Sequence, residues 1–179
     1  MYEYLDRRYA LALYQVGEKN GKVEEYLNNL REICQLIDED RNFQEVIKHP
    51  QISTIKKKET FTNIFKGKID DELLSFLLIL IDKDRIKYLR EKLNEMEKIH
   101  LQKNNTLVAN IKTAVPLLES EVKALKQKLE NQYNKNIIMT TEVDKSILGG
   151  VYVRVGNDVI DGTVKSKLDE MKDIILKRE

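Results

Sequence analysis

Cysteine, proline and glycine are scarce in this sequence. Cys34 is the only cysteine, so the chain cannot form an internal disulfide and nothing points to an oxidising compartment. There are two prolines and seven glycines, and most of the glycines lie in the last third, which favours long helices first and a turn-rich segment later. Long apolar runs are also absent. The longest, Leu73–Ile81, is nine residues long and includes Ser75, far below the ~20 residues that a membrane-spanning helix needs.

The chain also lacks an excess of charge of either sign. It contains 31 basic and 30 acidic residues, and neither half is strongly basic, which argues against nucleic acid as a partner. Its first residues, MYEYLDRRY, include acids and no apolar signal core. With 41% apolar and 34% charged residues, the composition is typical of a folded, soluble protein. We therefore expect a cytoplasmic protein with no direct membrane insertion, which only other chains would hold near a membrane.

Motifs for catalysis and for cofactor binding are missing as well. Neither GxxxxGK[ST] nor GxGxxG occurs, and the glycines between Gly149 and Gly162 have a spacing that fits hairpin turns. His49 and His100 are far from each other and from Cys34, so these residues cannot form a conventional zinc site. Cys34 falls within an apolar helical stripe and is expected in the core rather than as a nucleophile. We expect no catalytic residue, no cofactor and no metal.

The first part of the chain predicts a compact bundle of six helices with short connections. In the first helix, several apolar residues recur at helical spacing and form one face, while Ala10, Leu11 and Tyr14 widen the apolar surface beyond a single stripe. The residues of that face are Leu5, Tyr9, Ala12, Leu13 and Val16. The six helices are expected at residues 4–19, 23–39, 42–48, 55–66, 70–83 and 85–101. The fifth is expected to begin at Asp70 or Asp71, where a carboxylate can cap the free backbone amides.

The second part predicts a small mixed α+β domain, joined to the first by a linker at residues 102–106. Gly156-Asn157 is expected to form a two-residue hairpin turn, and residues 161–163, Asp-Gly-Thr, a turn before the last helix. Alternating apolar residues predict strands around residues 107–111, 137–143, 151–155 and 158–160, and helical spacing predicts helices near 118–133 and 164–175. The expected inner face of the last helix is Val164, Leu168, Met171 and Ile175.

The predicted helix at residues 70–83 is unusual because apolar residues cover every side of it. Such a helix has to be buried all round. One interpretation places it at the centre of the bundle, enclosed by the other helices. The other has one side facing the core and the opposite side lining an exposed groove for a partner helix. Periodicity alone leaves both open.

The closing segment, residues 148–171, carries the most specific motif: LGGVYVRVGNDVIDGTVKSKLDEM. It is similar to the signature of the delta subunits of bacterial F-type ATP synthases, the counterparts of the mitochondrial oligomycin-sensitivity-conferring protein. Gly149 stands where that family often has alanine, and Thr163 replaces its usual serine. Residues 8–14, RYALALY, resemble the opening of the family, and Asp84-Arg85-Ile86 resembles its G-R-apolar motif, with Asp84 in place of glycine.

The resemblance implies a two-domain adaptor without catalytic activity: a six-helix bundle at residues 1–104 and an α+β domain at residues 105–179. A groove between the first and fifth helices would receive the amphipathic N-terminal helix of an ATP synthase alpha subunit. Mapped onto this sequence, its residues would be Tyr9, Ala12, Leu13, Phe76, Ile79 and Leu80. The second domain would bind the C-terminal ends of the b-subunit stalk, in a region that includes Val151, Arg154, Asp161, Gly162 and Lys165.

By the same resemblance, the chain is expected to be peripheral, on the cytoplasmic side of the cell membrane, within a proton- or sodium-translocating ATP synthase. Two other classes of protein stay open beside it. One is a stand-alone helical interaction adaptor unrelated to ATP synthase, and the other is a small enzyme with an unrecognised site. The closing motif argues against both.

Overall fold

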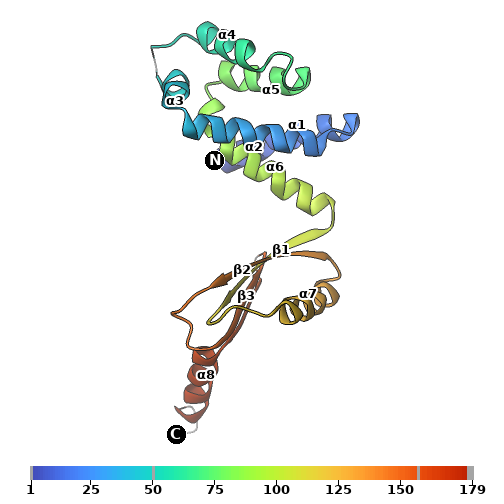
Figure 1. Cartoon of the computed structure of the whole chain (residues 1–179), viewed down its shortest axis with the longest axis vertical. Helices are drawn as coiled ribbons and strands as arrows, with labels where there is room; N and C mark the ends of the chain where they lie inside the picture. Colours follow the sequence, from blue (N-terminus) through green and yellow to red (C-terminus); the bar gives the residue numbers. More distant parts are fainter. Residues whose placement is uncertain (1, 50, 157, 177–179) are drawn as a thin grey trace. The chain divides into compact units, whose positions relative to one another are not determined.

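A computed structural model describes residues 2–49, 51–156 and 158–176 of the chain. The chain divides into two compact units, Met1–His100 and Leu101–Glu179. The first is helical, and the second combines a sheet with helices (Figure 1). The expected α+β class is therefore confirmed. Each unit has a hydrophobic core of its own.

The helices of the first unit lie close to their predicted positions. A single 3₁₀ turn, η1 (Ile86–Tyr88), precedes the last of them. Predicted boundaries differ from the observed ones by no more than a few residues, which is the usual uncertainty at fraying helix ends. The α-helices are α1 (Tyr2–Asn20), α2 (Val23–Glu39), α3 (Arg41–Lys48), α4 (Thr54–Phe65), α5 (Asp71–Asp82) and α6 (Leu89–Lys103).

Local side-chain chemistry sets where these helices begin. The Asp40 carboxylate accepts hydrogen bonds from the backbone amides of Asn42 and Phe43 at the start of α3, at 2.8 and 3.2 Å. Ser53 caps α4 through the amide of Lys56 at 3.3 Å. Asp70 caps α5 by accepting from the amide of Glu72 at 3.0 Å, as predicted. Each cap satisfies amides that have no partner inside the helix, which typically contributes ~1 kcal/mol.

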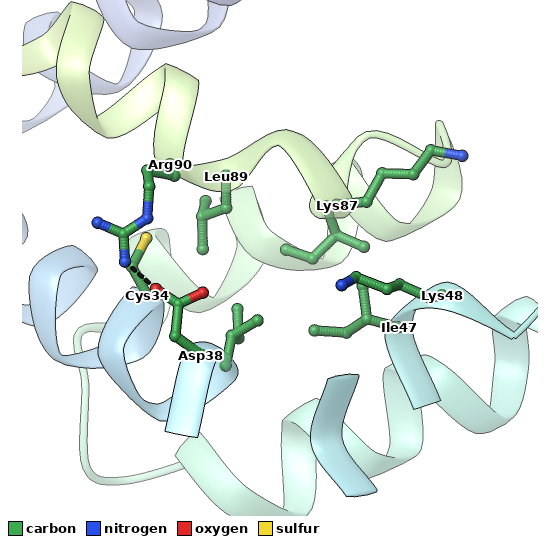
Figure 2. A pocket seen from close by; sticks show the side chains of 9 residues that line it. Cys34, Asp38, Ile47, Lys48, Lys87, Leu89 and Arg90 are labelled. Atoms are coloured by element: carbon green, nitrogen blue, oxygen red, sulfur yellow. Dashed lines mark hydrogen bonds and ion pairs between the residues drawn. The ribbon is translucent and has the colours of Figure 1, made fainter. Parts of the chain in front are cut away.

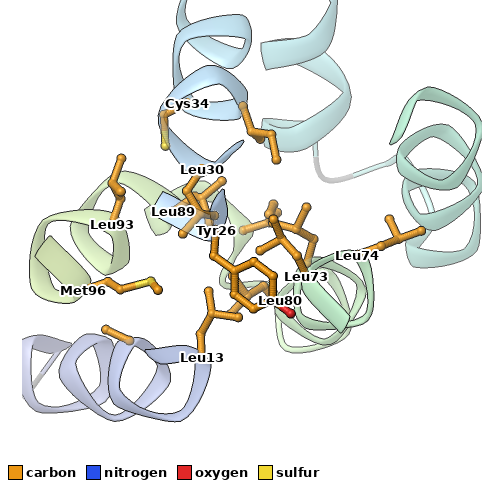
Figure 3. Close-up of a cluster of buried hydrophobic side chains, with 14 of the residues drawn as sticks. Leu13, Tyr26, Leu30, Cys34, Leu73, Leu74, Leu80, Leu89, Leu93 and Met96 are labelled. Atoms are coloured by element: carbon orange, nitrogen blue, oxygen red, sulfur yellow. The ribbon is translucent and has the colours of Figure 1, made fainter. Parts of the chain in front are cut away.

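The core of the first unit contains side chains from each of the helices α1 to α6. Figure 3 shows how residues of α1, α2, α5 and α6 point toward one another in it. Tyr26, Leu73, Leu77, Leu80 and Met96 are fully buried. Burying one such side chain contributes roughly 1.5–3 kcal/mol. Cys34 also lies in this core, as predicted, with 4% of its surface exposed.

The buried face of α1 differs from the predicted one. The helix buries Ala10, Leu13 and Tyr14, whereas Ala12 and Val16 are exposed. Of the predicted face only Leu13 is buried, because α1 is apolar over a wide arc and several stripes fit the same spacing. Packing against α2 and α5 selects one of these stripes and leaves the other uncovered.

The connection from α5 to α6 shows why the sequences that this chain resembles have glycine at the position of Asp84. Asp84 adopts a left-handed backbone conformation, with φ of 51°. Its amide donates to the carbonyl of Ile81 at 3.0 Å, and the amide of Arg85 donates to the carbonyl of Leu80 at 2.7 Å. Glycine has no steric penalty in this conformation, while aspartate is one of the few other residues that tolerate it.

The second unit contains a four-stranded sheet in the order β2-β1-β3-β4. β1 pairs parallel with β2, and the β1–β3 and β3–β4 pairs are antiparallel. One face of the sheet packs against α7 around Ala109, Ile111, Leu129, Ile137, Val153 and Val155. The elements are β1 (Thr106–Thr113), α7 (Glu119–Tyr133), β2 (Asn136–Val143), β3 (Gly150–Val155), β4 (Asp158–Thr163) and α8 (Val164–Leu176).

The predicted turn at residues 161–163 is wrong. These residues end β4, and α8 follows directly at Val164. Gly162 does not take the positive φ that a turn would require; Gly150 does, with φ of 88°. A Cβ on Gly150 would lie 2.3 Å from the carbonyl oxygen of Gly162, so the two glycines allow β3 and β4 to approach closely. The turn at Gly156 joins paired Val155 and Asp158, and Asn157 lies outside the described residues.

The predicted inner face of α8 is exposed. Val164, Leu168 and Met171 are 44%, 56% and 62% exposed, and the side chain of Ile175 lies outside the described residues. Helical spacing identifies an apolar stripe, but it does not say whether the same chain covers it. Here α7 occupies the apolar face of the sheet, while α8 extends from the end of β4.

Candidate functional site

An open groove, lined mainly by apolar side chains, lies between α1 and α5. It has a volume of about 380 Å³. Ile79 is half exposed in it and Val16 is 38% exposed, so large apolar side chains face solvent there. The lining residues are Ala12, Leu13 and Val16 from α1, and Glu72, Ser75, Phe76 and Ile79 from α5.

The apolar surface of α5 exceeds what the core can cover. Leu73, Leu77 and Leu80 are fully buried by the bundle, and Leu74 and Ile81 are nearly so. The four α5 residues of the groove follow the spacing i, i+3, i+4, i+7 and therefore form a second stripe along the helix. The structure thus decides between the two interpretations of this helix, since one side faces the core and the other lines an exposed groove.

Aromatic contacts support one end of the groove. The ring of Tyr9 meets Phe76 edge to face, with ring centroids 6.3 Å apart. Arg85 donates a hydrogen bond to the Tyr9 hydroxyl, and its guanidinium lies 5.1 Å from the centre of the ring. These contacts hold Phe76 in place between the core and the groove.

A polar network holds the opposite end. The Asp70 carboxylate accepts from Lys22 Nζ at 2.6 Å and from the Tyr26 hydroxyl at 2.8 Å. The hydroxyl also lies 3.2 Å from the carboxylate of Glu72, which accepts from the side-chain amide of Asn20 as well. Hydrogen bonds from Lys22 and Tyr26 lower the pKa of Asp70 to about 2. Burial raises the pKa of the Tyr26 hydroxyl, and its hydrogen bond to Asp70 raises this pKa further. The network ties the start of α5 to α1 and α2.

The structure brings together four of the six predicted groove residues: Ala12, Leu13, Phe76 and Ile79. Tyr9 does not line the groove but supports Phe76 from the side. Leu80 does not belong to it either, because its side chain is fully buried in the core. Sequence reasoning missed Val16, Glu72 and Ser75 as groove residues, although each lies one helical turn from a predicted one.

The predicted stalk-binding residues lie on the β3–β4 hairpin and the start of α8. Arg154, Asp161 and Lys165 are exposed, while Val151 and Gly162 are half-buried. Tyr152 and Arg154 share one face of β3 and Val151 belongs to the other, so the five residues do not form one surface. Asp161 accepts from the amide of Thr163 at 2.9 Å, and this hydrogen bond lowers the pKa of its carboxyl group.

A small cavity lies beside Cys34. Its volume is about 60 Å³, and an ion pair between Asp38 and Arg90 lies next to the sulfur (Figure 2). Burial raises the pKa of the Cys34 thiol to about 11, so the reactive thiolate is scarce at neutral pH. Within the described ranges, no group of three or more His, Cys, Asp or Glu residues is placed to hold a metal ion. In the same ranges, no helix is long and apolar enough to cross a membrane.

The chain thus combines a helical unit, which has an exposed groove between α1 and α5, with an α+β unit that has a core of its own. Comparisons with known proteins identify the family. A sequence model of the ATP synthase delta (OSCP) subunit family matches residues 5–175. The chain therefore belongs to the ATP synthase delta (OSCP) subunit family.

Full-length relatives agree with this assignment. The chain is 70% identical to the ATP synthase subunit delta of Clostridium perfringens strain SM101 over 179 residues, which is 100% of both chains. It is 69% identical to that of Clostridium botulinum strain Eklund 17B, again over the whole of both chains. Its fold resembles a chain in the cryo-EM structure of the Toxoplasma gondii mitochondrial ATP synthase hexamer, with a TM-score of 0.67 and 20% identity. That match covers 96% of this chain and 97% of the other.

Proposed function

We propose that this chain is a non-catalytic subunit of the peripheral stalk of a proton- or sodium-translocating F-type ATP synthase. It would link the catalytic head to the stalk and so resist the torque of the rotor. Its place would be peripheral, on the cytoplasmic side of the cell membrane. Family membership over residues 5–175 supports the assembly, and the exposed groove supports a role in binding.

The predicted domain at residues 1–104, which contains the first unit, would act as a six-helix docking domain for the N-terminal helix of the alpha subunit. The observation that carries this proposal is the second stripe of α5, in which Phe76 and the half-exposed Ile79 line the groove together with Ala12 and Val16 of α1. An amphipathic helix with apolar residues at i, i+3, i+4 and i+7 would complement it. Burial contributes about 25 cal/mol per Å² of apolar area, before the cost of association is subtracted.

The predicted domain at residues 105–179, which lies within the second unit, would bind the C-terminal ends of the b-subunit stalk. Exposed apolar side chains on α8 and β4, among them Val159, Leu168 and Met171, support this proposal. Because alpha and b would belong to one assembly, binding through two domains would add avidity without any new contact. This role requires no chemical reaction, because the chain would only have to keep alpha and b bound to each other's assembly under the torque of the rotor.

The test is binding of a peptide with the sequence of the alpha N-terminal segment, measured by isothermal titration calorimetry. Ile79→Asp places a charge in the groove and should weaken binding at least tenfold, because a hot-spot contact near the centre of an interface contributes about 2 kcal/mol or more. Ile55→Asp is the matched control, since Ile55 is 70% exposed on α4, away from the groove. Equal binding by both variants would contradict the groove assignment. Capture of neither alpha nor b by the intact chain would favour a stand-alone adaptor.

A further inference from the structure

A second cavity, of about 200 Å³, lies beyond the Tyr9 end of the groove. α1 and α5 run in opposite directions, since Asn20 contacts the start of α5 and Tyr9 contacts Phe76. The cavity therefore lies between the N-terminal part of α1 and the residues that follow the C-terminus of α5. Its lining residues are Leu5, Asp6, Lys83, Asp84, Arg85, Lys87, Tyr88 and Lys92.

The groove and the cavity lie along one line of α1. Leu5 is on the same helical stripe as Ala12 and Val16, because steps of seven and four residues return to nearly the same side of a helix. At 1.5 Å per residue, the distance along α1 from Val16 to Leu5 is roughly 16 Å. A partner helix of about three turns would therefore span both.

The cavity has an excess of positive charge. It is lined by four basic and two acidic residues. Lys92, 2% exposed, donates to the Asp6 carboxylate at 2.7 Å and to the carbonyl of Tyr88 at 3.0 Å. Lys87 pairs with Asp84 at 2.7 Å. Both acids of the cavity are thereby matched to a lysine.

The excess charge is that of Arg85 and Lys83. Among the described residues, neither of these two side chains forms an ion pair. Arg85 is half-buried and uses one of its five N–H groups on the Tyr9 hydroxyl. A guanidinium is more weakly hydrated than an ammonium and matches the geometry of a carboxylate with two parallel hydrogen bonds. The cavity is thus suited to a carboxylate that arrives from outside the chain.

We propose that this cavity receives an acidic side chain of the partner helix that occupies the groove. That residue would lie on the partner helix about two turns beyond the apolar residues beside Ala12, since ~10 Å of helix separates Ala12 from Leu5. Arg85 determines specificity: it selects partners that combine an apolar stripe with an acid at this distance. The inference rests on the proposed function of the groove, because it assigns the charge of the helix that binds there.

The experiment measures the affinity of the alpha N-terminal peptide for the intact chain at low and high salt. Arg85→Gln should weaken binding about tenfold at low salt and less at high salt, because a charge-assisted hydrogen bond is lost and its contribution is screened by ions. Replacing the matching peptide carboxylate by its amide should produce the same loss. The two changes together should cost no more than either alone, as expected for groups in direct contact.

Two controls separate a specific contact from a loss of overall charge and from damage to the fold. Arg41→Gln removes an exposed positive charge on α3, away from the cavity, so it should retain the affinity of the unmodified protein. If Arg41→Gln weakens binding as much as Arg85→Gln at low salt, the effect is one of overall charge and the proposal is overturned. Thermal unfolding of each variant shows that the bundle is intact.

The outcomes also distinguish this inference from the function on which it rests. If Ile79→Asp abolishes binding while Arg85→Gln binds like the unmodified chain at every salt concentration, the groove assignment stands and the acidic contact is refuted. If the peptide does not bind the unmodified chain, both fail. If inorganic phosphate stabilises the unmodified chain but not Arg85→Gln, and does not compete with the peptide, the cavity binds a free anion instead.

Discussion

The two units differ in how much of their apolar surface they bury. Among the described residues, 22 buried apolar residues form the core of the first unit, and six form that of the second. The second unit instead exposes large apolar side chains along β4 and α8, including Val159, Leu168 and Met171. Since buried apolar area is the main favourable term in folding, the first unit holds itself together, while the second is expected to gain most from a partner.

The largest effect is expected from breaking either core. Leu77→Ala removes a fully buried side chain from α5 and should destabilise the first unit by about 2–5 kcal/mol. Leu129→Ala makes the same substitution in the smaller core of the second unit, where Leu129 of α7 is 2% exposed. This variant should unfold the second unit alone. Urea denaturation followed by circular dichroism measures both, and the reactivity of buried Cys34 reports on the first unit only. A single shared transition in both variants would show that the two cores do not unfold independently.

A smaller effect is expected from the polar network at the start of α5. Because the folded pKa of Asp70 is about 2, below its value of 3.8 in the absence of partners, the network stabilises the first unit above pH ~4. That contribution should be lost as the pH falls from about 4 to 2. After allowance for solvent screening it amounts to about 1 kcal/mol. Asp70→Asn should flatten the pH dependence of the melting temperature in this range, while Asp71→Asn, next to it and exposed, should not.

The smallest effect concerns the left-handed residue at the end of α5. Asp84→Gly should stabilise the first unit by roughly 0.5–1 kcal/mol, because glycine removes the steric cost of a φ of 51°. Loss of the exposed Asp84–Lys87 ion pair offsets only a few tenths of this. Asp84→Ala loses the same ion pair and keeps the strain, so it should lower the melting temperature. A lower melting temperature for Asp84→Gly would mean that the ion pair outweighs the strain.

Most of the secondary structure followed from local chemistry. Apolar spacing predicted the helices of the first unit, and Asp70 was recognised as a cap because a carboxylate at that position satisfies free amides. The exceptions arose where an apolar pattern fits more than one partner. In α1 the buried stripe is displaced from the predicted one, and in α8 the expected inner face is exposed. At residues 161–163 the turn composition proved compatible with the end of a strand.

The candidate site shows the same division. Four of its residues were named from a resemblance to known sequences. The pattern alone left Leu80 and Ile79 equivalent, although one is fully buried and the other is half exposed. The sequence drew attention to Arg85 through a motif, but it did not predict the second cavity, because Asp6 is far in the chain from Arg85 and Lys92.

What the sequence by itself determined is therefore the order of the elements, the excess of apolar surface on two helices and the family. Each of these depends on residues that are near one another in the chain. Only the tertiary structure decided which apolar stripe stays uncovered and which charges have no partner. Those properties depend on which other helices pack against a given helix. A helix that is apolar on more than one side can be packed on any of them, so its own sequence does not select the side.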